Sequence, residues 1–353
     1  MRGDFDNAGV ARCDTEKRTL WLGLLPVRGA AGRALVASLV CCGALFGVSA
    51  AAESDRGWFA AIADWFSGSD DSEFEDATPN DVYRASLDLL AEIRILREEL
   101  GADDYPAEAE AQDDRAPLHV YAKSLEVLGK VSRVQRRHGM PVGKAGQIPV
   151  KVIEPGDVLA SVSTILDQLR EIKSQMVIAR EIDPAPLEPG KTTSMVYKNL
   201  ADASFQLDGL VGRPLSPNDV YLNTMHLLDD LTLIATKLRA PVKEEAPAVE
   251  GRKTPKDVAQ QVLRASYKMV NLQTRLGMDA SSVPTLTLVR VTPSEVFDAT
   301  NMLLAETMRV KHHLGIEALR EERPPSRNKQ PTDVFAQVLL VIMNLDALMA
   351  TVS

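Results

Sequence analysis

The stretch Thr78-Pro79-Asn80-Asp81-Val82-Tyr83 decides the fold of this chain, because it combines the signals of a helix start. Thr78 is a good N-cap residue, Pro79 suits the first helical position, and Asp81 stands where a capping box carries its acid. Val82 then begins an apolar stripe. The stretch therefore predicts a helix that starts at Pro79.

The same signature recurs along the chain at a fixed spacing. Copies start at positions 78, 116, 154, 192, 216, 254, 292 and 330, with degraded copies at 116 and 192. Every step is 38 residues except one step of 24 residues. A fixed period of this length is the mark of a repeat protein. The short step divides the copies into two blocks, 78–215 and 216–353, and predicts a tandem duplication of a four-helix unit.

Each copy continues with apolar or small residues at the spacing of a heptad seam, which is typical of helices in a bundle. In the first copy these residues are Val82, Ser86, Leu89, Ile93, Leu96 and Leu100. A glycine follows the last of them in four copies, at Gly101, Gly139, Gly277 and Gly315, where a left-handed residue ends a helix. The predicted fold is all-α, with 38-residue single-helix repeats and long, partly extended linkers.

Linker length bears on the direction of the helices. A linker of about 14 residues can span about 46 Å, more than a helix of about 33 Å. Each linker can therefore run back along its helix, which favours parallel helices within a block, although an antiparallel bundle with packed loops stays open. Only Arg213, Pro214 and Leu215 separate the two blocks, so we expect the helices that flank this joint to be antiparallel or sharply angled.

Residues 1–52 resemble a targeting segment. Arg28 and Arg33 precede an apolar run over 34–48, and small residues follow it. This order predicts a secretory signal peptide cleaved after Ala50 or Ala52, or, if it is not cleaved, a membrane anchor. Either reading places the rest of the chain outside the cytoplasm, in the periplasm or another exported location, with the inner membrane as the site of anchoring.

Charge and cysteine usage restrict the partners and the chemistry. The chain has a net charge of −9, and removing residues 1–52 makes it −11, so nucleic acid and anionic lipid are disfavoured partners. Membrane contact is expected only through the N-terminal segment. All cysteines, Cys13, Cys41 and Cys42, lie in the predicted leader, so the mature chain would have neither a disulfide nor a thiol nucleophile.

Residues 53–77 form a short amphipathic segment followed by an acidic linker. Its apolar residues at helical spacing are Trp58, Phe59, Ile62, Trp65 and Phe66. The segment is interpreted either as a short helix that docks on the repeats or as a detached anchor for a partner or a membrane interface.

The residue after each repeat valine is aromatic in six of the eight copies of a chain with only 5% aromatic residues. These residues are Tyr83, Tyr121, Tyr197, Tyr221, Phe297 and Phe335. The simpler interpretation is a staple that packs under the incoming linker. The sharper one is a binding end, since parallel helices would bring these rings to one end of each bundle.

No catalytic or metal-binding pattern stands out. The five histidines lack the i, i+4 spacing of a helical metal pair, and no Glu-x-x-His motif lies in the helices. Phosphate-loop, dinucleotide-binding and nucleophile-elbow motifs are also missing from the sequence. We therefore predict a non-enzymatic protein without a cofactor or metal.

The sequence favours an exported helical-repeat protein that acts as a cell-envelope scaffold or protein–protein interaction module. Repeats enlarge a binding surface without requiring chemistry. The alternative is a periplasmic small-molecule-binding or sensory bundle, with its ligand held near the aromatic ends. A large buried apolar pocket would favour the alternative, whereas a solid core would favour the scaffold.

Overall fold

The computed structural model describes residues 74–102, 106, 108–143, 146–283 and 291–352. All of them belong to one compact unit, Gly68–Ser353. The predicted leader and the segment from Trp58 to Phe66 lie outside the described residues, so those two predictions stay predictions.

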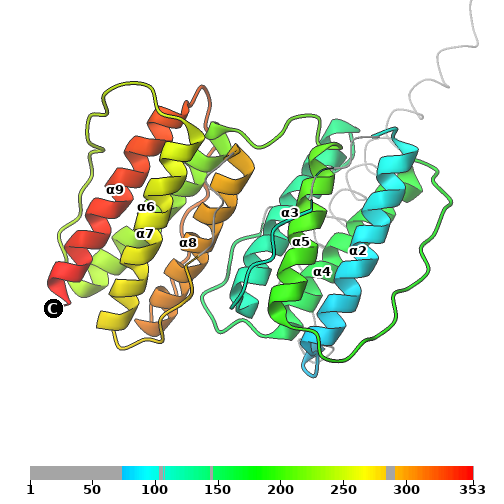
Figure 1. Cartoon of the computed structure of the whole chain (residues 1–353), viewed down its shortest axis with the longest axis horizontal. Coiled ribbons are helices and arrows are strands. Elements are labelled where there is room, and N and C mark those ends of the chain that lie inside the picture. Colours follow the sequence, from blue (N-terminus) through cyan, green and yellow to red (C-terminus); the bar gives the residue numbers. More distant parts are fainter. Residues whose placement is uncertain (1–73, 103–105, 107, 144–145, 284–290, 353) are drawn as a thin grey trace, which may run out of the picture. The chain divides into compact units, whose positions relative to one another are not determined.

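The described part of the chain contains eight α-helices and no strand, which confirms the predicted all-α repeat fold (Figure 1). The first four helices are α2 (Pro79–Glu99), α3 (Pro117–Arg137), α4 (Pro155–Gln175) and α5 (Thr193–Asp208). The second four are α6 (Pro217–Leu238), α7 (Pro255–Arg275), α8 (Pro293–His313) and α9 (Pro331–Thr351). Seven of the eight start at the proline of the signature, as predicted.

The acid of the signature caps the helix, and at Thr192, Thr254 and Thr292 the hydroxyl accepts a backbone N–H as predicted, whereas two other starts differ. The Asp81 carboxylate accepts the backbone N–H of Thr78 at 2.9 Å and also its hydroxyl at 2.7 Å. Ser216 and Asp219 repeat this geometry. At these two starts the hydroxyl thus donates to the acid, which orients the carboxylate over the cap.

The helix ends follow the predicted glycines. Gly101, Gly139, Gly277 and Gly315 all have φ between +63° and +76°, the left-handed conformation that favours glycine. In α4 the same place is taken by Val177 with φ +60°, an unusual conformation for a β-branched residue. Helix α5 has only 16 residues and is shorter than its repeat predicts.

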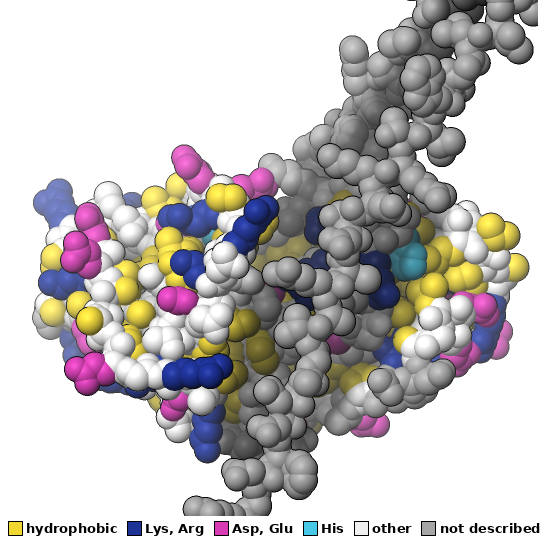
Figure 2. All heavy atoms as spheres, turned by 90° about the horizontal axis from the view of Figure 1, so that it is seen from above, with side chains coloured by type: hydrophobic (Ala, Val, Ile, Leu, Met, Phe, Trp, Pro, Cys, Tyr) yellow, Lys and Arg dark blue, Asp and Glu magenta, His cyan; other side chains and the backbone are white. Residues whose placement is uncertain are grey.

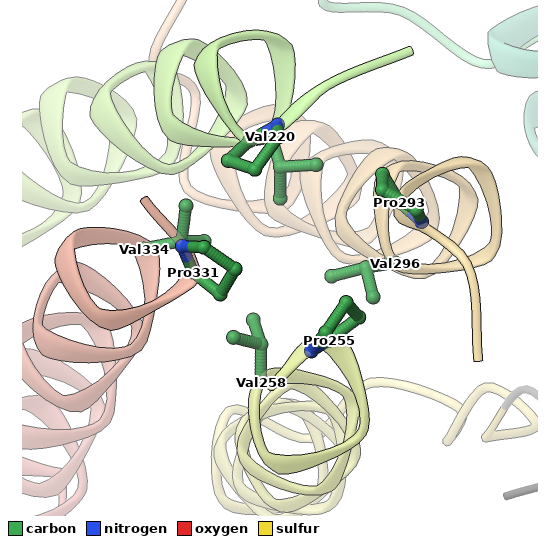
Figure 3. Close-up of a pocket in the computed structure, with 8 residues that line it drawn as sticks. Val220, Pro255, Val258, Pro293, Val296, Pro331 and Val334 are labelled. Carbon is green, nitrogen blue, oxygen red and sulfur yellow. The ribbon is translucent and has the colours of Figure 1, made fainter. Parts of the chain in front are cut away.

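The four helices of each bundle run parallel, as the linker length favoured. Their first turns meet around a shared hollow at one end of the bundle, which Figure 3 shows for the second bundle. In the second bundle the hollow is lined by Pro217, Val220, Pro255, Val258, Pro293, Val296, Pro331 and Val334. In the first bundle the lining residues are Pro79, Val82, Pro117, Val120, Pro155, Val158, Thr193 and Val196. The prolines and valines of the signature thus close one end of each bundle.

Parallel helices require linkers that return to the starting end, and side chains hold these linkers in place. Asp88 of α2 accepts the backbone N–H of Ala185, and Asn80 of the same helix accepts that of Lys191. The linker before α5 therefore runs along α2 towards its first turn. Asp202 of α5 accepts the backbone N–H of Ala109 in the same way.

Each bundle has its own hydrophobic core, with Leu89 and Ile165 fully buried in the first and Ile234 and Leu345 in the second. Helices α2 and α3 each pack on α4 and α5, and α6 and α7 each pack on α8 and α9. Among the described helices, α9 alone is long and apolar enough to cross a membrane by length and composition, and its buried residues belong to the second core.

Helices α3 and α8 connect the bundles. Near the start of α3, His119 meets Glu306 in the middle of α8, whereas Lys123 meets Asp298 near the start of α8. The order of these contacts shows that the two helices run in opposite directions. Met302 and Met308 of α8 also pack into the first core.

Candidate functional site

The structure places the six predicted aromatic residues near the first turns, but they do not line the hollows. The hollow in Figure 3 is lined only by prolines and valines. Tyr197 is buried, at 2% exposed, and the other five rings are half-buried. The rings therefore lie around each end rather than inside it.

Four of the rings contact a cation from a linker that returns to the starting end. Lys191 lies over the Tyr83 ring, with its Nζ at 4.6 Å from the ring centroid, and Lys329 lies over Tyr221 at 4.2 Å. Lys253 over Phe335 and Arg115 over Tyr197 follow at 5.2 and 5.4 Å. Cations in this position are attracted by the ring face. This geometry fits the staple interpretation of the aromatic residues.

The linker cations belong to a pattern that sequence reasoning missed. The residue directly before the cap alternates between apolar and basic: Ala77, Arg115, Ile153, Lys191, Leu215, Lys253, Val291 and Lys329. Each basic residue also donates its backbone N–H to a polar side chain in the first turn of a neighbouring helix: Ser194, Asn80, Thr332 and Asn218, respectively. The sequence contains this signal, because only the second, fourth, sixth and eighth copies have a basic residue directly before the cap.

The hollows have room for a water molecule and not for a ligand. Their volumes are about 20 Å³ in the second bundle and about 10 Å³ in the first. Ligand pockets usually enclose hundreds of Å³. A third hollow of about 10 Å³ lies beside Glu306 and Ser281. In the described part of the chain, the predicted binding end therefore has no preformed cavity of ligand size.

The densest polar cluster lies between α3 and α8 and is built around His119. The copy that starts at Ala116 has histidine where the other proline-containing copies have an acid. The His119 Nδ1 accepts the backbone N–H of Ala116 at 3.1 Å, so it caps the helix as the acid does elsewhere. Since Nδ1 accepts, the ring proton lies on Nε2, which donates to Glu306 Oε1 at 2.5 Å. One neutral imidazole thus joins a helix cap to the opposite bundle.

Glu306 is saturated with donors. Its second oxygen accepts Gln273 Nε2 at 2.5 Å and Arg309 Nη1 at 2.9 Å. Burial raises the pKa of this carboxyl, but the hydrogen bond from His119, the charge of Arg309 and the hydrogen bond from Gln273 lower the pKa below its usual value overall. Glu306 therefore stays ionised, and its donors make it a structural anion rather than a free acid or base.

A second cluster lies one turn further along α3. The buried Lys123 ammonium contacts Asp298 of α8 and, at 2.8 Å, Glu126. The Tyr197 hydroxyl donates to the same Asp298, at 2.8 Å. Burial alone would lower the pKa of Lys123, yet Asp298 and Glu126 raise it well above its usual value. Burial and Asp298 also raise the pKa of Tyr197, so neither group is poised to exchange protons near neutral pH.

A buried ion pair recurs at the same place in both bundles. Lys173 of α4 contacts Glu92 of α2 at 2.6 Å, and Lys311 of α8 contacts Asp230 of α6 at 2.7 Å. Both pairs join residues 81 positions apart in the sequence. The duplication of the pair indicates a structural role within the repeat unit.

Among the described residues, no group of three or more histidine, cysteine, aspartate or glutamate side chains could hold a metal ion. The clusters consist of paired charges without an open substrate position, and their chemistry is that of interfaces. No protein-family profile, curated protein or solved structure matches this chain.

Proposed function

We propose that this protein is an exported scaffold that offers helix faces to protein partners and has no enzymatic activity. The supporting observation is the closed interior of each bundle, where the hollows reach only about 20 Å³ while polar helix faces remain exposed. A small-molecule sensor would need a cavity more than ten times larger.

Charge also supports a protein partner over a nucleic acid. The chain carries 49 acidic and 40 basic residues. On the left-hand part of the face that Figure 2 shows, basic and acidic side chains are interspersed. Phosphate backbones are bound by surfaces on which basic residues cluster.

The location follows from the same proposal. The basic residues and apolar run within 1–52 would direct the chain into the periplasm or to the outer face of the inner membrane. N-terminal sequencing of the protein from an envelope fraction tests this, because a start at Glu53 or Ala51 is expected, and an intact N-terminus on cytoplasmic protein would contradict it.

Cross-linking of the full chain in intact cells, followed by purification of the adducts, tests the scaffold proposal. We expect specific protein adducts, and no rise in the melting temperature with a metabolite library, since a ligand stabilises only a protein that binds it. A clear stabilisation by one small molecule without protein adducts would instead favour the sensory bundle.

A further inference from the structure

Helices α3 and α7 occupy the same place in the two bundles, and among the residues that the structure describes α8 covers the outward face of α3, whereas the matching residues of α7 are exposed. Leu118 and Ala122 of α3 are 6% and 4% exposed, where α8 packs on this helix. The residues at the same positions of α7 are Lys256 and Gln260, and both are exposed. Within the described part of the chain, the outward face of α7 is therefore an exposed counterpart of an interface.

This face of α7 is basic and carries an exposed aromatic ring. Its exposed residues at helical spacing are Lys256, Gln260, Arg264, Tyr267, Asn271 and Thr274. These six residues include no acid, but the half-buried Asp257 follows Lys256, and its pKa is lowered by hydrogen bonds from Thr254 and by the charges of Lys253 and Lys256. Arg264 forms no ion pair with any residue that the structure describes, and Tyr267 is 61% exposed. Arginine and tyrosine are the residues that most often contribute binding energy at interfaces.

The contact between α3 and α8 shows one way in which this face is used, although the residues of α7 at the positions of His119 and Lys123 are Asp257 and Gln261. There the cationic Lys123 and the N–H of His119 hold two carboxylates of one helix, Asp298 and Glu306. On α7 the two exposed cations, Lys256 and Arg264, are eight residues apart, which is about 12 Å along the helix. A helix that lies along α7 can place two acidic residues at this distance, with an apolar residue against Tyr267.

We propose that the outward face of α7 binds an acidic amphipathic helix of a partner protein. This inference rests on the proposed scaffold function and names the surface and the partner chemistry. Lys256 and Arg264 pair with carboxylates two turns apart on the partner, and Tyr267 packs on its apolar stripe. The face of α4, which corresponds to α8, carries Asp167, Arg170 and Glu171 and lacks this basic character.

A stapled helical peptide with two glutamates seven residues apart and leucines between them is the probe, measured by fluorescence anisotropy with the full chain at low salt. We expect saturable binding of the peptide that weakens as the salt concentration rises. Arg264→Glu should reduce the affinity for the peptide at least tenfold, and Tyr267→Ala should reduce it about fivefold. Arg94→Glu, an exposed charge reversal on α2, is the matched control and should change affinity less than about twofold.

Absence of binding by wild type, or equal affinity in Arg264→Glu, would overturn the proposal. Equal binding of the peptide with glutamines in place of the glutamates would also overturn it. Tighter binding of duplex DNA or of phosphatidylglycerol vesicles through Arg264 would assign the face to another class of partner. Protein adducts in cells that do not depend on Arg264 would leave the scaffold proposal standing while this one fails.

Discussion

Helices α3 and α7 start from the same repeat and end in different surroundings. Both place their valine stripe in a core, as Val120 and Val127 do in α3 and Val258 and Val262 do in α7. Their outward faces differ, because α3 buries Lys123 and Glu126 against α8 and α5, whereas Gln261 is half-buried and Arg264 exposed on α7. The repeat therefore specifies the inside of a bundle, and departures from it specify what the bundle touches.

The largest difference in unfolding free energy is expected from the buried ion pair between Lys311 and Asp230 in the second bundle. Asp230→Ala leaves Lys311 without its main partner at a site where both side chains are 0% exposed, which should cost about 3–5 kcal/mol of unfolding free energy. Glu92→Ala in the first bundle should cost less, because Lys173 is 7% exposed and can reach water. Urea denaturation measures both.

The double variant Asp230→Leu with Lys311→Met is the control, and it should recover part of the loss because the Lys311 charge is no longer buried, while Arg320, whose side chain is 7% exposed, still loses its bond to Asp230. A loss below about 1 kcal/mol in Asp230→Ala would show that the pair is not structural in the second bundle.

The contact between the bundles gives the next largest effect. Glu306→Ala removes the acceptor of His119, Gln273 and Arg309, and should cost about 2–3 kcal/mol, as expected for buried bonds to a charged group. Gln168→Ala, at the same position of α4, should cost less than about 1 kcal/mol because it removes no charged group. Thermal and chemical denaturation of both variants compare the covered and the uncovered face, and equal losses would refute the distinction.

The two bundles should differ in the pH dependence of their stability because of His226 of α6, whose counterpart in α2 is Asp88. Burial lowers the pKa of His226 to about 4, the charges of Arg320 and Arg323 act in the same direction, and Asp229 opposes them. Since the unfolded histidine has a pKa near 6.5, stability is fully present above about pH 6.5 and is lost as pH falls towards 4.

The loss attributable to His226 should be of the order of 2 kcal/mol between pH 6.5 and 4. His226→Gln should remove this part of the pH dependence in denaturation curves, whereas His138→Gln, at an exposed helix end, should leave it unchanged. An unaltered pH profile in His226→Gln would show that the folded histidine titrates normally.

The smallest expected effect is a gain in the stability of the first bundle. Val177→Gly should stabilise the first bundle by about 1 kcal/mol or less, because φ +60° strains valine and its side chain is 89% exposed, so little packing is lost. Gly315→Val, at the same place in the second bundle, should destabilise by about 1–2 kcal/mol. Differential scanning calorimetry of the pair tests both signs, and a loss in Val177→Gly would point to a contact made by the valine side chain.

Much of the fold was predictable because its signals are local. A cap, a proline and an acid within four residues act on the same helix turn. Their positions therefore predicted that α2 begins at Pro79, and they predicted the starts of the six other helices that begin at a proline. Glycines at the left-handed positions gave the ends. The predicted capping role of the hydroxyl holds at Thr192, Thr254 and Thr292, whereas the early end of α5 was missed.

The candidate sites were less predictable. The aromatic positions were visible as a pattern, but the cations that cover Tyr83 and Tyr221 arrive from linkers about 110 residues away in the sequence. His119 stands at the position where other copies have the capping acid. Nothing in the sequence indicates that it contacts Glu306, which is 187 residues away. Long-range pairs of this kind carry no periodic signal.

Local sequence signals were enough to predict two sets of four capped helices with linkers long enough for a parallel arrangement, because helix starts, helix ends and apolar stripes depend on residues within a few positions of one another. The tertiary structure alone decided which faces meet. Burial of Lys123 and Glu306 becomes favourable only when α3 and α8 bring opposite charges and donors together, and α7, where no such helix arrives, keeps Lys256 and Arg264 in water.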